Sequence, residues 1–160
     1  MQYLFSCLLL LTSLHIGYAQ AYKLNAESST LKWTGKAAFS AYALSGTLEA
    51  SEGQFTLDDN TITAARITID MKSLDADIKD LKKHLRSEDF FEVKRFPTAT
   101  FVLTQAVELR EGPISLAGNF TIRGISQAET LQLNARQQDG AWIFDGTFSL
   151  DRTRYGIMFG

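Results

Sequence analysis

Cysteine, histidine and proline are scarce in this 160-residue chain, which contains one Cys, two His and two Pro. A single cysteine, Cys7, cannot form an intramolecular disulfide, so a small disulfide-stapled scaffold is excluded. One cysteine and two histidines also fall short of the ligand set of a structural zinc site. Because no Gly/Ser-rich or proline-rich stretch separates two composition regimes, the sequence predicts one domain without a linker.

An excess of positive charge is lacking as well. The chain has 16 Lys and Arg against 18 Asp and Glu, a formal net charge of −2, and a pI near 5.7. This balance predicts no basic surface for nucleic acid and gives no reason to expect a polyanionic partner. With 45% hydrophobic and 21% charged residues, the composition is that of a globular domain.

The amino terminus begins with an apolar run, residues 4–14, which has the length of a signal-peptide core and is too short to span a bilayer. Small residues follow at Gly17, Ala19 and Ala21. We therefore predict that residues 1–21 are a signal peptide cleaved after residue 19 or 21, and that the protein is exported to the periplasm or secreted. The competing interpretation is an amino-terminal core helix.

Alternation of apolar and polar residues dominates the rest of the chain. In residues 113–123, for example, Ile114, Leu116, Phe120 and Ile122 alternate with polar or small residues. A period of two is typical of half-buried antiparallel strands. Turn-forming residues separate these runs and predict about eight strands, near 22–25, 30–36, 43–50, 53–57, 61–71, 98–108 and 113–123, with a two-strand hairpin in 128–150.

One segment has helical rather than strand periodicity. Between residues 73 and 86, four apolar residues recur at helical spacing: Leu74, Ile78, Leu81 and Leu85. We predict a short amphipathic helix at about 75–86, with Asp75 and Asp77 at its amino end. Many short antiparallel strands and one helix favour a closed or nearly closed barrel, because closure removes exposed sheet edges.

Several motifs point to one family. Residues 85–101 (LRSEDFFEVKRFPTATF) combine a helix end, an acidic residue, paired phenylalanines and an aromatic–proline step into a strand. Residues 33–35 (WTG), 118–124 (GNFTIRG) and 152–157 (RTRYGI) are further matches. Through these motifs the mature chain resembles the YceI-like family of exported, lipocalin-like barrels associated with polyisoprenoid and other amphiphilic lipids. The resemblance implies one mainly β, antiparallel, lipocalin-like barrel over residues 22–160.

The chain departs from the family pattern at two places. Arg154 stands where many members have Asp before the aromatic–glycine pair, and the sequence stops at Gly160, where similar proteins continue into a closing strand. We expect either a truncated chain or a barrel open at one seam. An open seam would expose the strand near 141–151 and favour homodimerisation.

A barrel of about eight strands either fills its interior with its own side chains or encloses one slender ligand. The residues alone leave both alternatives open, and the family resemblance favours the ligand. In that interpretation an apolar tunnel is lined by Trp33, Phe39, Ile69, Phe101, Leu116, Phe120, Ile122, Leu133, Trp142, Phe144 and Phe148.

The mouth of the barrel has two groups of candidate residues. Phe90, Phe91 and Phe96 form either a mouth or lid, or a plug that fixes the helix to the barrel. Three arginines at strand ends, Arg123, Arg152 and Arg154, either contact an anionic headgroup or are ordinary rim charges.

Candidate catalytic groups are few. His84 is the one histidine left after signal cleavage, and Ser87 and Asp89 beside it lack a nucleophile elbow. Asp75, Asp77 and Asp80 lack the glycine and terminal glutamate of a calcium loop, and helix capping explains them more simply. We therefore expect no catalytic residue, no metal site and no cofactor, apart from a bound isoprenoid or quinone-like lipid.

Together these patterns predict an exported, non-catalytic protein that encloses a long-chain polyisoprenoid or similar amphiphile. The main alternative is a secreted structural or stress-related interaction domain with a self-filled core. An outer-membrane barrel is disfavoured by the helix and by the long 72–97 connection.

Overall fold

The computed structural model describes residues 19–36 and 43–158. Most of the predicted signal peptide and Phe39 lie outside these residues, so cleavage and export stay predictions. The elements, in chain order, are β1 (Gln20–Lys23), β2 (Leu31–Lys36), β3 (Ala43–Asp58), β4 (Thr61–Asp70), η1 (Met71–Ser73), α1 (Lys79–Arg86), β5 (Thr98–Leu103), β6 (Val107–Glu108), β7 (Gly112–Ile122), β8 (Ile125–Gln138), β9 (Ala141–Asp145) and η2 (Arg152–Tyr155).

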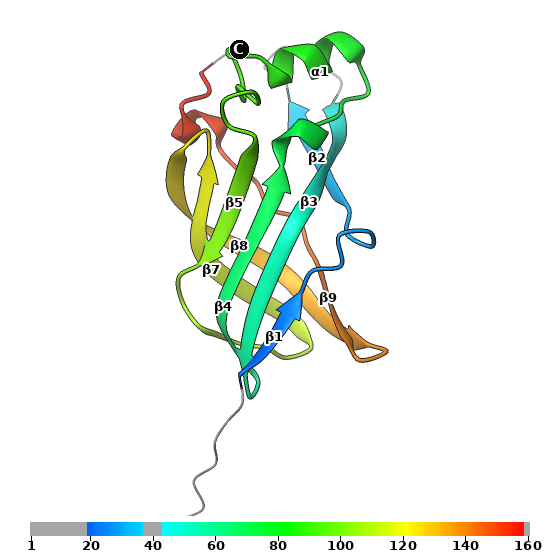
Figure 1. The fold of residues 1–160 in the computed structure, drawn as a ribbon, viewed down its shortest axis with the longest axis vertical. Coiled ribbons are helices and arrows are strands. Elements are labelled where there is room, and N and C mark those ends of the chain that lie inside the picture. Colours follow the sequence, from blue (N-terminus) through cyan, green and yellow to red (C-terminus); the bar gives the residue numbers. More distant parts are fainter. Residues whose placement is uncertain (1–18, 37–42, 159–160) are drawn as a thin grey trace, which may run out of the picture.

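The strands form one nine-stranded antiparallel sheet in the order β1-β3-β4-β5-β7-β8-β9, with β2 added to β3 and β6 to β4. Figure 1 shows this sheet curled around a long axis, with α1 across one end and the β3–β4 and β8–β9 hairpins at the other. Among the described strands, β9 pairs with β8 alone and β2 with β3 alone. The mainly β, lipocalin-like fold is confirmed, and the sheet is a half-barrel with its open side beside β9.

The predicted turn between strands 43–50 and 53–57 is wrong, because both belong to the continuous strand β3. A β-bulge between Ala50 and Glu52 shifts the register against β4, so the chain bends without leaving the sheet. Gly53 is buried, and a Cβ there would lie 2.6 Å from the Leu24 Cβ. The Ser-Glu-Gly sequence therefore marks a bulge and a close approach rather than a loop.

Two other predicted strands are shorter than expected. The strand placed at 98–108 ends at Leu103, and residues 107–108 pair with β4 as the separate strand β6. The last strand ends at Asp145 instead of reaching residue 150. At Gly146 the chain lies so close to β8 that a Cβ would be 2.5 Å from the Gln132 carbonyl oxygen.

The predicted helix begins four residues later than expected, because α1 spans only Lys79–Arg86. The helix-capping role given to Asp75 and Asp77 is wrong: Ile78 occupies the N-cap position without a side-chain cap. Asp75 instead pairs with Lys82 at 3.0 Å, and Asp77 accepts a hydrogen bond from the Ser45 hydroxyl. Both aspartates thus hold the loop before α1 in place, and Asp80 alone lies in the first turn.

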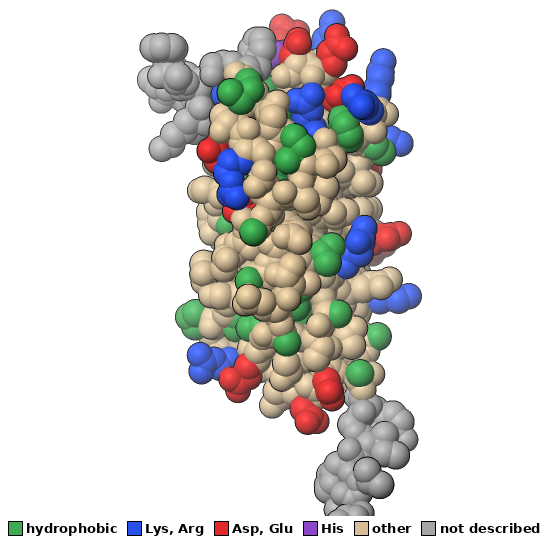
Figure 2. Space-filling view, turned by 90° about the vertical axis from the view of Figure 1, so that its left-hand side faces the viewer, with side chains coloured by type: hydrophobic (Ala, Val, Ile, Leu, Met, Phe, Trp, Pro, Cys, Tyr) green, Lys and Arg blue, Asp and Glu red, His purple; other side chains and the backbone are tan. Residues whose placement is uncertain are grey.

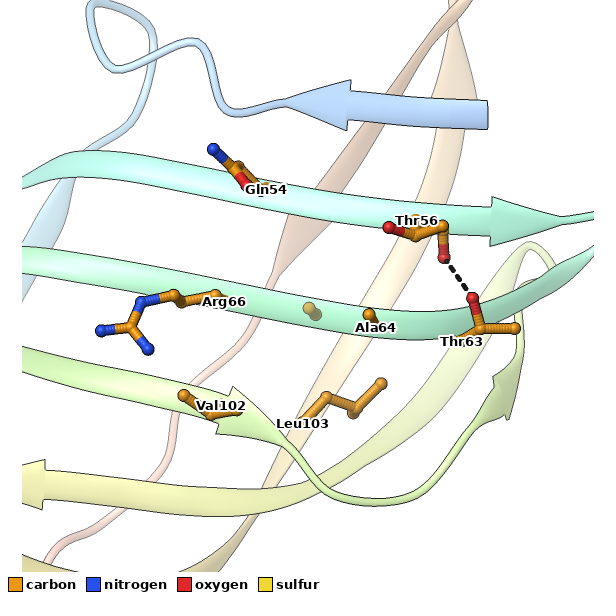
Figure 3. Close-up of a pocket in the computed structure, with 8 residues that line it drawn as sticks. Gln54, Thr56, Thr63, Ala64, Arg66, Val102 and Leu103 are labelled. Atoms are coloured by element: carbon orange, nitrogen blue, oxygen red, sulfur yellow. Dashed lines mark hydrogen bonds between the residues drawn. The ribbon is translucent and has the colours of Figure 1, made fainter. Parts of the chain in front are cut away.

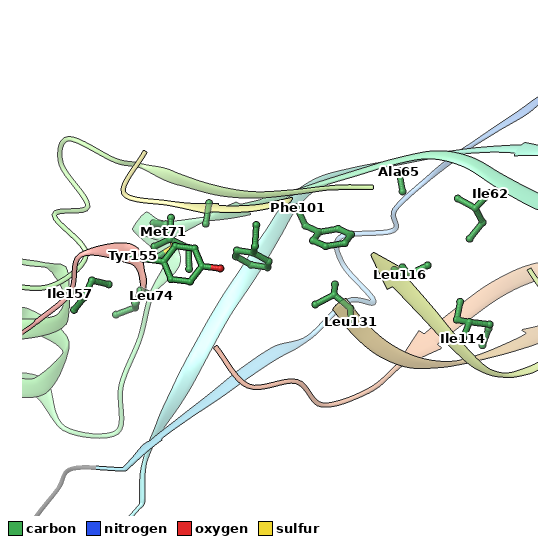
Figure 4. Packing of buried hydrophobic residues seen from close by; sticks show 14 of the residues in the cluster. Ile62, Ala65, Met71, Leu74, Phe101, Ile114, Leu116, Leu131, Tyr155 and Ile157 are labelled. Carbon is green, nitrogen blue, oxygen red and sulfur yellow. The ribbon is translucent and has the colours of Figure 1, made fainter. Parts of the chain in front are cut away.

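The core lies on the concave side of the sheet, where the predicted alternation holds. Along β7, residues 114, 116, 118, 120 and 122 are buried, and their neighbours are exposed or half-buried. Figure 4 shows the core extending from Tyr155 and Ile157 at one end, past Phe101, to Ile62 and Ile114 at the other. On the face drawn in Figure 2, hydrophobic side chains are scattered in small groups.

Candidate functional site: the concave apolar face

Four of the predicted tunnel residues form the middle of the core. Phe101, Leu116, Phe120 and Ile122 have exposed fractions of 1%, 1%, 4% and 8%. The rings of Phe101 and Phe120 lie 6.2 Å apart, centroid to centroid. These side chains share the concave face as predicted, and they fill this part of it by packing on one another.

Three other predicted residues form the open side of the half-barrel, and we call Trp142, Phe144 and Phe148 the aromatic wall. Trp142 and Phe144 are half-buried, and Phe148 is 40% exposed. The wall joins the core through two ring contacts, Phe144 stacked on Phe55 at 5.7 Å and Phe148 against Phe120 at 6.2 Å. These rings thus cover the core on one side and leave apolar surface on the other.

Trp33, Ile69 and Leu133 are half-buried against the same core. Trp33 is fixed by its indole nitrogen, which donates to the Asp75 carbonyl oxygen at 3.0 Å. Gly46 allows this contact, because a Cβ there would overlap the Asp75 carbonyl and lie 2.6 Å from the Trp33 Nε1. The structure thus places every predicted tunnel residue except Phe39, which lies outside the described residues, on or against the core.

The predicted mouth residues lie between α1 and β5. Phe90 and Phe91 are half-buried, pack against the core and meet edge to face at 4.9 Å. Their position is compatible with a plug under α1. Phe96 lies beneath the Arg95 guanidinium at 5.0 Å and beside Gly124 at the tip of the β7–β8 hairpin.

Each of the three predicted headgroup arginines has a partner within the protein. Arg123 reaches Glu92 at 3.5 Å and the Gly156 carbonyl oxygen at 3.3 Å. Arg152 donates to the Ile157 carbonyl oxygen at 2.8 Å and lies over the Phe90 ring. These contacts hold the carboxyl-terminal segment on the barrel, so a headgroup would have to compete with them.

Arg154, the third predicted headgroup arginine, pairs with Glu129 at 2.6 Å. The same carboxylate oxygen accepts a hydrogen bond at 3.0 Å from the hydroxyl of Tyr155, whose side chain is completely buried. Burial and the nearby Glu129 carboxylate raise the pKa of Tyr155 above its ordinary value. Sequence reasoning missed Glu129, because its partners lie more than twenty residues away along the chain.

Phe55 and Leu131 were missed too, although both belong to the apolar face. Leu131 is 5% exposed and Phe55 stacks on the aromatic wall. Their alternation with polar neighbours could have shown that they face the core.

Two surface hollows lie outside the apolar face. One, of about 210 Å³, lies over β3, β4 and β5 and is lined mainly by polar and small side chains (Figure 3). The other, of about 520 Å³, lies beside α1 and is lined by Lys79, Lys82, Lys83, Arg86, Ser87 and Lys94.

Within residues 19–36 and 43–158, no group of three or more His, Cys, Asp or Glu side chains is placed to hold a metal ion. No helix in these ranges is both long and apolar enough to cross a bilayer.

A curled antiparallel sheet with an apolar concave face and one helix across its end defines a lipocalin-like half-barrel. The YceI-like domain model matches residues 22–160, and the chain therefore belongs to the YceI-like family. It is 34% identical over 102 residues to protein YceI of Salmonella arizonae, covering 62% of this chain and 53% of that protein. A UPF0312 protein of Vibrio vulnificus is 31% identical over 90 residues, or 55% of this chain and 48% of that one. The matched region thus spans about half the length of these curated relatives.

Solved structures share the fold at low sequence identity. Burkholderia cenocepacia BcnA superposes with a TM-score of 0.73 at 23% identity, covering 85% of this chain and 86% of that one. A domain from Saccharophagus degradans, described as a polyisoprenoid binding domain implicated in plant cell wall breakdown, gives a TM-score of 0.63 at 16% identity, with 88% and 83% coverage. At these identities the likeness establishes the architecture.

Proposed function

We propose that this chain is an exported, non-catalytic binding protein that holds a long-chain polyisoprenoid or similar amphiphilic lipid on its concave face. The observation that carries the proposal is the aromatic wall. Trp142 and Phe144 pack against the core, Phe148 contacts the Phe120 ring, and all three stay partly exposed. Large rings left in this state beside an open sheet edge are typical of a surface that takes up apolar ligands.

The chemistry of the face suits a hydrocarbon tail. Apart from Tyr155, whose hydroxyl bonds to Glu129, the buried side chains of the described residues are apolar, so a tail lying here would desolvate few polar groups. A tail that buries about 400 Å² of apolar surface gains on the order of 10 kcal/mol, before the cost of ordering it. Because the middle of the core is self-packed, we place the tail along the wall and the open side rather than through the centre.

The two tryptophans of the chain, Trp33 and Trp142, both pack against this face and provide a direct assay. Titration of the purified protein with a long-chain polyprenol or a quinone-bearing isoprenoid should change its tryptophan emission saturably. Trp142→Phe should remove most of the change, and Trp33→Phe serves as the matched control. Emission that does not respond to either lipid would contradict the proposal.

A second candidate is an interaction domain that binds a protein partner. The self-packed middle of the core and the open edge of β9 favour it, because an unpaired strand can add a strand from another chain or from a second copy. This candidate predicts a mass that rises with concentration and no uptake of apolar lipid. Native mass measurements over a dilution series separate it from the binding protein.

A further inference from the structure

The hollow beside α1 is lined by positively charged side chains, although the protein as a whole has a net negative charge. We call its five cations, Lys79, Lys82, Lys83, Arg86 and Lys94, the basic face. The chain carries 16 Lys and Arg against 18 Asp and Glu, so 11 cations and 18 anions remain elsewhere, a net charge of −7. The near-neutral overall charge therefore does not exclude a local cluster of positive charge.

Most of the basic face is not neutralised by the protein. Lys82 pairs with Asp75, and this contact lowers the pKa of the Asp75 carboxyl. The positive charge of Arg86 also lowers the pKa of this carboxyl, more weakly than Lys82 does. In the part of the chain that the structure describes, Lys79, Lys83 and Lys94 have no carboxylate within 4.0 Å.

Acidic side chains near α1 in the sequence do not line the hollow. Asp80, Glu88 and Asp89 are exposed, and the described lining consists of the five cations and Ser87. The opposite end of the half-barrel, where Figure 1 places the β3–β4 and β8–β9 hairpins, carries Asp58, Asp59 and Asp139 in or beside its turns. The basic face is thus a local cluster within the α1 end, where the exposed Asp80, Glu88 and Asp89 also lie.

An exposed apolar residue immediately precedes the helix that carries most of the basic face. Ile78, the N-cap residue of α1, is 53% exposed, which is unusual for a large hydrophobic residue in this chain. Its carbonyl oxygen accepts the hydrogen bond of the Lys82 amide at 3.0 Å, so the two residues lie one helical turn apart. The apolar residues of α1 itself, Leu81 and Leu85, pack into the core, so Ile78 is the apolar side chain at this end that a bilayer could cover.

We propose that the basic face and Ile78 dock this protein, α1 end first, onto an anionic phospholipid bilayer. Uncompensated lysines would neutralise lipid phosphates, Ile78 would enter the headgroup layer, and the acidic far end would point away from the membrane. The net charge of −2 gives no reason to expect a polyanionic partner. The five cations that line one hollow provide such a reason, because they act together on a negatively charged surface. Docking does not depend on the lipid-binding role proposed above.

Vesicle co-sedimentation tests the proposal. The experiment uses the protein purified after export, and its intact mass identifies the residue at which it begins. The probes are vesicles of phosphatidylcholine alone and of phosphatidylcholine mixed with phosphatidylglycerol. We expect binding to the mixed vesicles only, decreasing as salt rises. The double variant Lys83→Gln/Lys94→Gln should lose about 30-fold in affinity, at about fivefold per lysine.

The matched control is Lys23→Gln/Lys32→Gln, which removes the same charge from exposed positions on β1 and β2. This control should bind nearly as well as the unchanged protein. Ile78→Ser should weaken binding in a way that persists at high salt, because its contribution is apolar. Equal losses in the two double variants would overturn the proposal, as would equal binding to both vesicle types. Capture of an acidic polysaccharide without vesicle binding would do so too.

Discussion

Replacing Phe148 with alanine should weaken lipid binding without unfolding the protein. A phenylalanine side chain buries roughly 200 Å² when fully covered, and Phe148 is 40% exposed. A lipid tail that covers this remainder would bury about 80 Å² of ring, worth about 2 kcal/mol or ~30-fold in affinity. Because the substitution also removes the ring contact with Phe120, it should lower the free energy of unfolding by about 1 kcal/mol.

Ile125→Ala is the matched control for this substitution. Ile125 is 39% exposed, almost the same fraction as Phe148, but it lies at the first position of β8, at the tip of the β7–β8 hairpin. Dissociation constants for a long-chain polyprenol, measured by tryptophan emission, should rise about 30-fold for Phe148→Ala and stay nearly unchanged for Ile125→Ala. Denaturant unfolding curves should show that both variants are folded under the binding conditions, so that a difference in affinity reflects the loss of contacts with the lipid. Equal affinities in the two variants would refute the placement of the tail on the aromatic wall.

Two further predictions concern stability. Gly46→Ala should cost about 2–4 kcal/mol, because the new Cβ overlaps the Asp75 carbonyl and displaces Trp33. Gly35→Ala, whose Cβ would meet Trp33 at an ordinary 3.7 Å, should cost little, and denaturant midpoints that match in the two variants would count against the close packing. Because burial and Glu129 raise the pKa of Tyr155 above 10.0, the stability from its neutral phenol should be complete below pH 10 and lost as the pH rises further towards the folded-state pKa. Tyr155→Phe should flatten this alkaline loss in thermal unfolding curves, and an unchanged slope would argue against the buried hydrogen bond.

The alternation of apolar and polar residues predicted the strands well where one face is buried and the other is exposed to solvent. The alternation in residues 113–123 identified β7 and its buried face, because a strand on a curled sheet has one side in the core. Ser51, Glu52 and Gly53 predict a turn but form a bulge, because the same residue types serve both. The continued pairing of β3 with β4 on both sides of Ser51 and the close approach of Leu24 to Gly53 distinguish the two.

The candidate site was predicted in part for the same reason. Aromatic residues at alternating positions identified the apolar face, but the sequence could not separate Phe101, which is buried at 1% exposure, from Phe148 at 40%. That distinction depends on how far the sheet closes, which is a property of long-range strand pairing. For Arg154 the sequence left a headgroup contact and a rim charge open, because its partner Glu129 lies on a strand that is distant in sequence.

The basic face shows the limit of charge counting. Composition alone gives a net charge of −2 and says nothing about where the charges lie. Lys94 is distant from Lys79 along the chain, and the turn after α1 brings both to one hollow. Surface potential is therefore a property of the fold.

The most direct test of the lipid-binding account is the intact native mass of the protein purified without detergent from the exporting compartment, followed by organic extraction. The account predicts one bound molecule per chain, with a polyprenyl or quinone-like mass released on extraction. A clean ligand-free mass that does not change after incubation with such lipids would contradict it.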